Sequence, residues 1–188
     1  YSRVMVMPKG ERVIKLQDPS GIDLKQYFLG LGLESLVFES ERDSNDNPNV
    51  LVEEQAYRPE LDDLYVLHKL IVENKRTTIL EFGTGWSSLI FAHALGENKK
   101  NYQDKIGNLR RNNPFELHVV DNEEEFIKVS RSRIPDELSD SCHFHHRDVY
   151  MTEFQGRYAT EFESLPLINP DFIYLDGPDQ FNIKNTIK

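Results

Sequence analysis

A glycine turn that follows a carboxylate is the feature of this sequence with the clearest potential for chemistry. In the stretch TTILEFGTGWSS, residues 77–88, a short β-branched run reaches Glu81, and Gly83 and Gly85 follow. Glycine has no Cβ, so such a turn can bend sharply and let a ligand approach its backbone. The alternative is a tight connection between a strand and a helix that binds nothing.

The carboxylate bears on the kind of ligand that this turn could hold. A dinucleotide-binding turn follows the pattern G-x-G-x-x-G and places a diphosphate at the start of a helix, whereas Ser88 stands here in place of the third glycine. An ionised Glu81 would repel a diphosphate and attract a cation. The sequence therefore favours a cationic ligand.

Three more acids follow runs that we predict to be strands. Asp121 closes the run FELHVVD, Asp148 closes SCHFHHRD, and Asp176 closes PDFIYLD. In an open sheet of parallel strands the carboxyl ends lie at one edge, and ligands bind there. We therefore expect these three side chains and Glu81 to stand at the ligand-binding edge of the sheet.

Asp121 has two competing interpretations. Its carboxylate could accept hydrogen bonds from the two hydroxyls of a ribose, as acids at this position do in nucleotide-binding sheets. It could instead cap the helix that we expect to follow, although Asn122 is also placed to fill that role. We favour the ribose.

An alternation of strands and helices positions the four acids. We expect strands over residues 77–82, 115–121, 141–148 and 170–176, with helices over 87–95 and 122–134 and a polar insertion over 97–114. This order is typical of the α/β class with a doubly wound, mostly parallel, Rossmann-like sheet. Residues 59–188 would form this ligand-binding domain, beginning with a helix, and residues 1–58 would form an N-terminal helical extension or lid.

The stretch EFGTGWSS, taken with the acids at the later strand ends, resembles the first motif of the class I S-adenosylmethionine-dependent methyltransferases. The resemblance covers residues 61–181. The ligand of that family carries a sulfonium and an ammonium but no phosphate, which agrees with the charge argument. The family fold has seven strands and only four are evident here, so we expect a fold that is incomplete at its C-terminal end.

The resemblance implies roles for individual residues. The glycine turn would pack against the methionine part of the ligand, and Glu81 would orient the loop or meet the ligand's amino group. Asp121 would hold the ribose, and Asp148 would accept a hydrogen bond from the adenine amino group beside the Val149 backbone. Trp86 would pack against the pocket or shield it. The cofactor-binding residues so implied are Glu81, Gly83, Thr84, Gly85, Trp86, Ser87, Asp121, Asn122, Asp148 and Val149.

Asp176 is the candidate catalytic residue, because the resemblance places its strand end beside both the transferred methyl group and the acceptor. It would act as a base or orient the acceptor, with Asp179 as a second acid in the same loop. A metal-assisted subgroup of sugar and antibiotic O-methyltransferases carries Asp–Gly–x–His in this loop, and here Asp179 stands at the histidine position. Magnesium suits oxygen ligands, but two acids from one loop do not form a cage, so we do not favour a metal.

Three histidines in the stretch CHFHHRD are also potential metal ligands. On a strand His143 and His145 share one face, whereas His146 lies on the other face with Cys142 and Phe144. A zinc site needs three or four converging ligands. Residues along one strand do not converge, so we expect these histidines to have packing and surface roles.

Methyl transfer from S-adenosylmethionine to a small-molecule acceptor, with oxygen as the accepting atom, is the function that the resemblance implies. Two alternatives stay open. One is an NAD- or nucleotide-binding oxidoreductase of Rossmann type, which the acid at residue 81 argues against. The other is a non-catalytic, methyltransferase-like interaction module.

Composition limits the remaining choices. The net charge of −10 argues against a nucleic-acid partner, since phosphate binding requires a basic face. No apolar run approaches the roughly 20 residues that span a bilayer, so we expect no membrane partner. Cys142 is the only cysteine, which excludes an internal disulfide and agrees with a cytoplasmic location. The sequence leaves an oligomer open.

Overall fold

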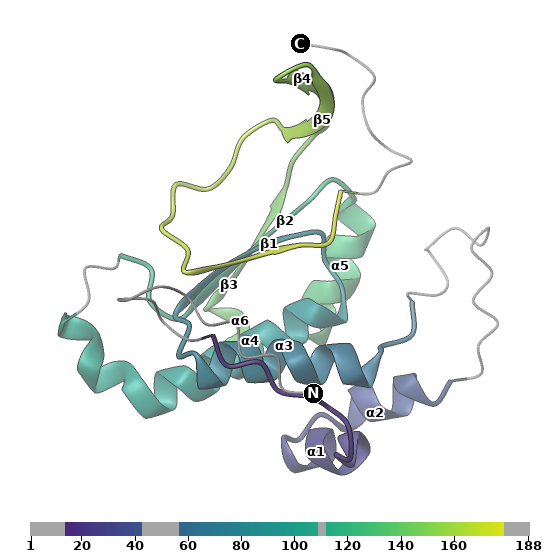
Figure 1. The fold of residues 1–188 in the computed structure, drawn as a ribbon, viewed down its shortest axis with the longest axis vertical. Coiled ribbons are helices and arrows are strands. Elements are labelled where there is room, and N and C mark those ends of the chain that lie inside the picture. The colour runs from purple at the N-terminus through teal and green to yellow at the C-terminus, as the bar shows by residue number, and fades with distance from the viewer. Residues whose placement is uncertain (1–13, 43–56, 109–111, 179–188) are drawn as a thin grey trace. The chain divides into compact units, whose positions relative to one another are not determined.

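Figure 1 shows the computed structural model of the 188-residue chain, which describes residues 14–42, 57–108 and 112–178. The chain divides into two compact units, Tyr1–Lys75 and Arg76–Lys188. The functional boundary that we predict between residues 58 and 59 differs from this division, because the helix that follows it, α3 (Leu61–Glu73), belongs to the first unit. The two units are described separately below.

The described residues of the first unit form helices. Its helices are α1 (Leu24–Gly30), α2 (Glu34–Ser40) and α3. Asp23 caps α1, since its side chain accepts a hydrogen bond from the backbone N–H of Gln26 at 3.0 Å. The Tyr27 hydroxyl lies 2.7 Å from Nδ1 of His68 and so links α1 to α3. Helices α1 and α2 lie in the segment for which we predict a helical extension.

The described residues of the second unit form two sheets. Its elements are β1 (Thr78–Phe82), α4 (Trp86–Tyr102), the 3-10 helix η1 (Gln103–Asn108), β2 (Glu116–Asp121), α5 (Glu124–Arg133), α6 (Asp136–Ser139), β3 (Cys142–His146), β4 (Val149–Phe154), β5 (Arg157–Phe162) and β6 (Phe172–Leu175). Strands β3, β2, β1 and β6 form one parallel sheet in that order, and β4 pairs antiparallel with β5. The predicted α/β class with a mostly parallel sheet is therefore confirmed, and the arrangement is compatible with a Rossmann-like fold.

The sheet is buried most deeply at its centre. Residues 78–81 of β1 and 117–121 of β2 are buried, which is why these strands read as continuous apolar runs in the sequence. Helix α4 packs on one face, where the ring of Phe91 lies 5.8 Å from that of Phe172 and 5.4 Å from that of Tyr174. On the opposite face of β6, Ile173 and Leu175 are exposed.

Helix α4 extends further than predicted. We expected a polar insertion from residue 97, but the helix continues to Tyr102 before η1 begins. Asn98 is buried on this helix and donates a hydrogen bond from Nδ2 to the carbonyl of Arg76 at 2.9 Å. Lys99 and Lys100 in the last turn complement the negative end of the helix dipole.

The connection between β3 and β6 contains the β4–β5 hairpin (Figure 1), which the sequence did not predict. Its register runs from Val149 opposite Phe162 to Phe154 opposite Arg157. Among the described residues, no helix combines the length and the apolar character that a membrane span requires.

Candidate functional site

The turn after β1 is tied to both neighbouring strands. The backbone N–H of Gly83 donates to the carbonyl of Val120 at 2.9 Å, and the N–H of Asp176 donates to the carbonyl of Phe82 at 2.8 Å. Because β3, β2, β1 and β6 run in the same direction, their carboxyl ends lie at one edge of the sheet. Asp121 is the last residue of β2 and Asp176 directly follows β6, whereas Glu81 is the second-last residue of β1 and Asp148 lies between β3 and β4, directly before β4.

Two features of position 83 require a glycine there: its backbone conformation and its contact with the loop after β6. Its φ of +85° lies in the left-handed region that favours glycine. A Cβ at this position would lie 2.5 Å from the carbonyl oxygen of Asp176, and a Cβ on Gly177 would lie 2.7 Å from the Cα of Gly83. The loops after β1 and β6 therefore touch backbone to backbone.

Glu81 is buried and faces the start of α4 rather than solvent. Its side chain is fully inaccessible. It accepts hydrogen bonds from the hydroxyls of Ser87 and Ser88, the latter at 2.7 Å. The Ser88 hydroxyl also lies 3.1 Å from that of Thr84. These contacts join Glu81 to the first turn of α4, directly after the glycine turn.

The charge of Glu81 differs from the one assumed in the sequence argument. Burial raises the pKa of Glu81 to about 8. The nearby charges of Asp176 and Asp121 also raise this pKa, whereas the hydrogen bonds from Ser87 and Ser88 lower it. The carboxyl is therefore largely protonated at neutral pH. In the absence of a ligand, Glu81 therefore carries little negative charge. The repulsion of a diphosphate that the sequence predicts requires an ionised Glu81.

Asp121 already has a structural role. Only 3% of the residue is exposed, and its Oδ1 accepts a hydrogen bond from the N–H of Glu123 at 2.8 Å. Burial raises its pKa to about 6, while hydrogen bonds from the backbone of Glu123, Thr84 and Asn122 oppose that shift. The carboxyl thus links the glycine turn to the segment that leads into α5.

The prediction that Asn122 caps α5 is wrong. The helix begins at Glu124, its N-cap is Glu123, and no side chain caps it there. Instead, the Asp121 carboxylate accepts a hydrogen bond from the N–H of Glu123, the residue before the helix. Two acids in the first turn, Glu124 and Glu125, interact favourably with the positive end of the helix dipole.

Trp86 is held by the end of α5. It is the first residue of α4, and the guanidinium carbon of Arg133 lies 3.8 Å from the centre of its ring. The Ser130 hydroxyl of α5 lies 3.5 Å from the carbonyl of Gly85. The shielding role that we expect for Trp86 is thus accompanied by a specific stacking contact that the sequence did not predict.

Asp148 and Val149 stand at the start of the β4–β5 hairpin. The Asp148 carbonyl accepts a hydrogen bond from the N–H of Glu163 at 2.8 Å. Val149 is 1% exposed. The rings of Phe82 and Phe162 lie 5.4 Å apart and join the hairpin to the end of β1.

Asp176 is exposed, and the second predicted catalytic residue, Asp179, lies outside the described residues. The most important residue that the sequence argument missed is Ser88. We treated it as a missing glycine, yet it holds Glu81. Its place in the first helical turn after a strand-end acid is the signal that could have found it.

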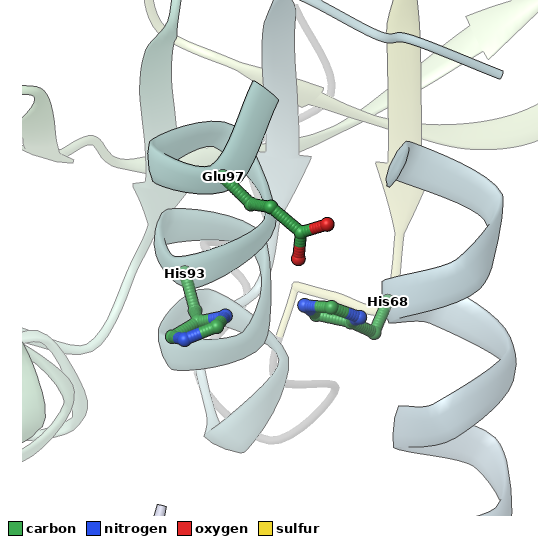
Figure 2. Close-up of side chains that lie close together, drawn as sticks. All are labelled: His68, His93 and Glu97. Carbon is green, nitrogen blue, oxygen red and sulfur yellow. The ribbon is translucent and has the colours of Figure 1, made fainter. Parts of the chain in front are cut away.

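Helix α4 carries a further pair of potential ligands. Figure 2 shows His93 and Glu97 on one face of the helix, one turn apart. Two side chains from one helix are fewer than the three or four ligands of a zinc site. His68, also drawn there, belongs to the other compact unit.

Comparison with known proteins identified no relative: no family model matches the sequence, and the searches of curated proteins and of solved structures found no match.

We expect Gly83→Ala to destabilise the protein by about 1–3 kcal/mol more than Gly156→Ala, the cost of overpacking against the Asp176 backbone. Gly156 is the matched control, because its φ is +77° but a Cβ there would meet nothing within 4 Å. Urea unfolding followed by circular dichroism measures both free energies. Equal losses would mean that the contact between the loops does not constrain residue 83.

We also expect the free energy of unfolding to fall as the pH rises from about 4.5 to about 8. Across that window Glu81 releases its proton in the unfolded chain but keeps it in the folded one, so increasing pH favours unfolding, by at most about 1.4 kcal/mol per pH unit. Glu81→Gln should flatten the profile above about pH 6, because the raised pKa of Asp121 gives a slope of the same sign below that pH. Glu124→Gln, which alters an exposed glutamate of α5, should leave it unchanged. A Glu81→Gln profile as steep as that of the wild type would assign the slope to other groups.

Proposed function

We propose that this chain binds S-adenosylmethionine at the turn after β1 and transfers its methyl group to an oxygen of a small molecule. The observation that carries the proposal is the backbone contact of Gly83 with Asp176 and Gly177 at the carboxyl edge of the parallel sheet. That contact puts a glycine turn, two strand-end acids and the start of a helix in one place. The sheet order β3-β2-β1-β6 also agrees with the beginning of the order 3-2-1-4 found in Rossmann folds.

Discrimination between a cationic ligand and a diphosphate would depend on whether Glu81 ionises when the ligand binds. A cation placed near Glu81 favours its charged form and lowers its pKa, so the side chain would lose its proton and attract the ligand. A diphosphate would have the opposite effect, keeping Glu81 protonated while Asp121 and Asp176 repelled it. The buried carboxyl would thus respond to the sign of the ligand's charge.

The remaining residues would position the two reactants. Asp121 would accept hydrogen bonds from the ribose, Asp148 would meet the adenine amino group, and exposed Asp176 would face the acceptor, with Asp179 as a second acid. S-adenosylmethionine supplies a methyl group that the sulfonium has already activated, so holding the acceptor oxygen in line with it supplies much of the rate. Asp176 would take the acceptor's hydroxyl proton where the oxygen must be deprotonated. Transfer converts the sulfonium to the neutral thioether of S-adenosylhomocysteine.

Calorimetry of the full-length protein in two buffers of different ionisation enthalpy tests this proposal. We expect S-adenosylmethionine and S-adenosylhomocysteine to bind with net release of protons, because both carry an ammonium group, and NAD to give no heat. Glu81→Gln should remove most of the proton release. Absence of heat with both sulfur ligands, or binding of NAD alone, would exclude the proposal.

Methyl transfer to a panel of hydroxyl-bearing small molecules then distinguishes an enzyme from a non-catalytic module. We expect Asp176→Asn to lose turnover while it keeps its affinity for S-adenosylhomocysteine. Binding without turnover on any acceptor would support the module.

We expect Asp121→Ala to weaken the binding of S-adenosylhomocysteine by about 1–3 kcal/mol, the cost of leaving hydrogen-bonding groups unpaired. Asp121→Asn is the matched variant, since an amide oxygen can still accept the N–H of Glu123 but the negative charge is lost. Thermal unfolding of both variants reports the structural role separately. A less stable Asp121→Ala protein with unchanged affinity would show that Asp121 only supports the turn and α5.

A further inference from the structure

A cluster of histidine and glutamate side chains lies on the sheet, away from the glycine turn. Glu116 and His118 alternate on β2, so both point to one face, and His143 and His145 do the same on β3. The register pairs His118 with His143. The adjacent strand thus supplies the convergence that His143 and His145 lack along their own strand.

The three potential ligand atoms lie close enough together to converge on one metal ion. Nε2 of His118 lies 2.9 Å and Nε2 of His143 lies 3.6 Å from Oε2 of Glu116. The ligand atoms of Glu116, His118 and His143 all lie within 4.8 Å of one another. In a tetrahedral zinc site with bonds of about 2.0–2.1 Å, neighbouring ligand atoms are about 3.3–3.4 Å apart. Small side-chain movements would therefore suffice to close the three ligands around one ion.

Neighbouring side chains hold the ligands in place. Nδ1 of His118 lies 3.2 Å from Nε2 of His145, and their rings stack with an interplanar angle of 5°. A metal-binding histidine donates its second ring N–H to a hydrogen-bond acceptor, which fixes the ring and its tautomer. A neutral His145 with an unprotonated Nε2 would be such an acceptor for Nδ1–H of His118. Asn113 donates from Nδ2 to Oε2 of Glu116 at 2.8 Å and orients that carboxylate.

The cluster is open on one side. The His118 side chain is only 8% exposed, whereas those of Glu116 and His143 are 28% and 39% exposed. An ion held by these three side chains would have one buried ligand and would keep a coordination position towards solvent. That arrangement of three protein ligands and one open position is the arrangement of catalytic zinc sites.

The cluster is separate from the candidate ligand site. Glu81 pairs with Val119, the residue after His118, so the Glu81 side chain points to the opposite face of the sheet. Glu116 is the first residue of β2, whereas Asp121 is its last. The chemistry of this cluster therefore does not depend on the proposed methyl transfer.

We propose that Glu116, His118 and His143 bind a divalent transition-metal ion of the zinc type, with His145 orienting His118. Two imidazoles and one carboxylate suit zinc and cobalt, whereas magnesium prefers oxygen ligands and waters. The competing explanation is a set of hydrogen-bonded side chains that takes no ion.

Cobalt binding to the full chain tests the site, because tetrahedral Co²⁺ absorbs visible light strongly and octahedral Co²⁺ does so weakly. After treatment with a chelator, the wild-type protein should bind one equivalent with a tetrahedral spectrum, and Zn²⁺ but not Mg²⁺ should displace it. His143→Ala removes a partly exposed ligand and should weaken binding by at least about 100-fold, since loss of an orienting partner alone costs about 10–100-fold. Glu116→Gln should do likewise, and His145→Ala should cost about 10–100-fold without changing the spectrum.

His146→Ala is the matched control. His146 lies on the same strand but on the other face, where its Nε2 is 3.1 Å from the carbonyl of Asn122, so its removal should leave cobalt affinity unchanged. Unfolding midpoints in chelator show whether each variant is folded. Absence of stoichiometric cobalt binding, an octahedral spectrum, or wild-type affinity in both folded His143→Ala and folded Glu116→Gln would overturn the proposal.

Discussion

The hydrogen bonds between the buried carboxyl of Glu81 and the hydroxyls of Ser87 and Ser88 determine the shape of the candidate site. A carboxyl removed from water must find partners inside the protein, and these serines supply them at the start of α4. Their position fixes where the helix begins after β1, and hence the path of the glycine turn between them. That path brings Gly83 against the backbone of Asp176 and Gly177. Burial of one side chain is thus linked to the meeting of two loops.

The sequence predicted the strands that carry the acids because each is a short apolar run ending at a polar residue. Strands β1, β2, β3 and β6 form where we expected them, and the predicted parallel sheet is present. The environment of Glu81 was not predictable in the same way. Period-two alternation assigns its side chain to a face, but only the packing of α4 on that face removes it from water. The change in its pKa follows from that packing.

The pairing of side chains across neighbouring strands could not be predicted from the sequence either. His118 and His143 are 25 positions apart, and only the register of β2 with β3 places them opposite each other. The histidines of the CHFHHRD stretch do not converge along β3 itself. That stretch carries no information on which side chains of β2 lie beside them. The β4–β5 hairpin was missed for a related reason, since its pairing depends on a turn at Gln155 and Gly156, both with positive φ.

The backbone contact at Gly83 also has a consequence for how such a chain can diverge. Two loops that touch without an intervening side chain cannot change length independently, because an insertion in one would push the other away. Insertions and deletions in this unit would therefore be tolerated better at the tip of the β4–β5 hairpin, where a Cβ on Gly156 would meet no atom within 4 Å. An alignment of descendants should show indels there, and a fixed spacing between the acid of β1 and its glycine.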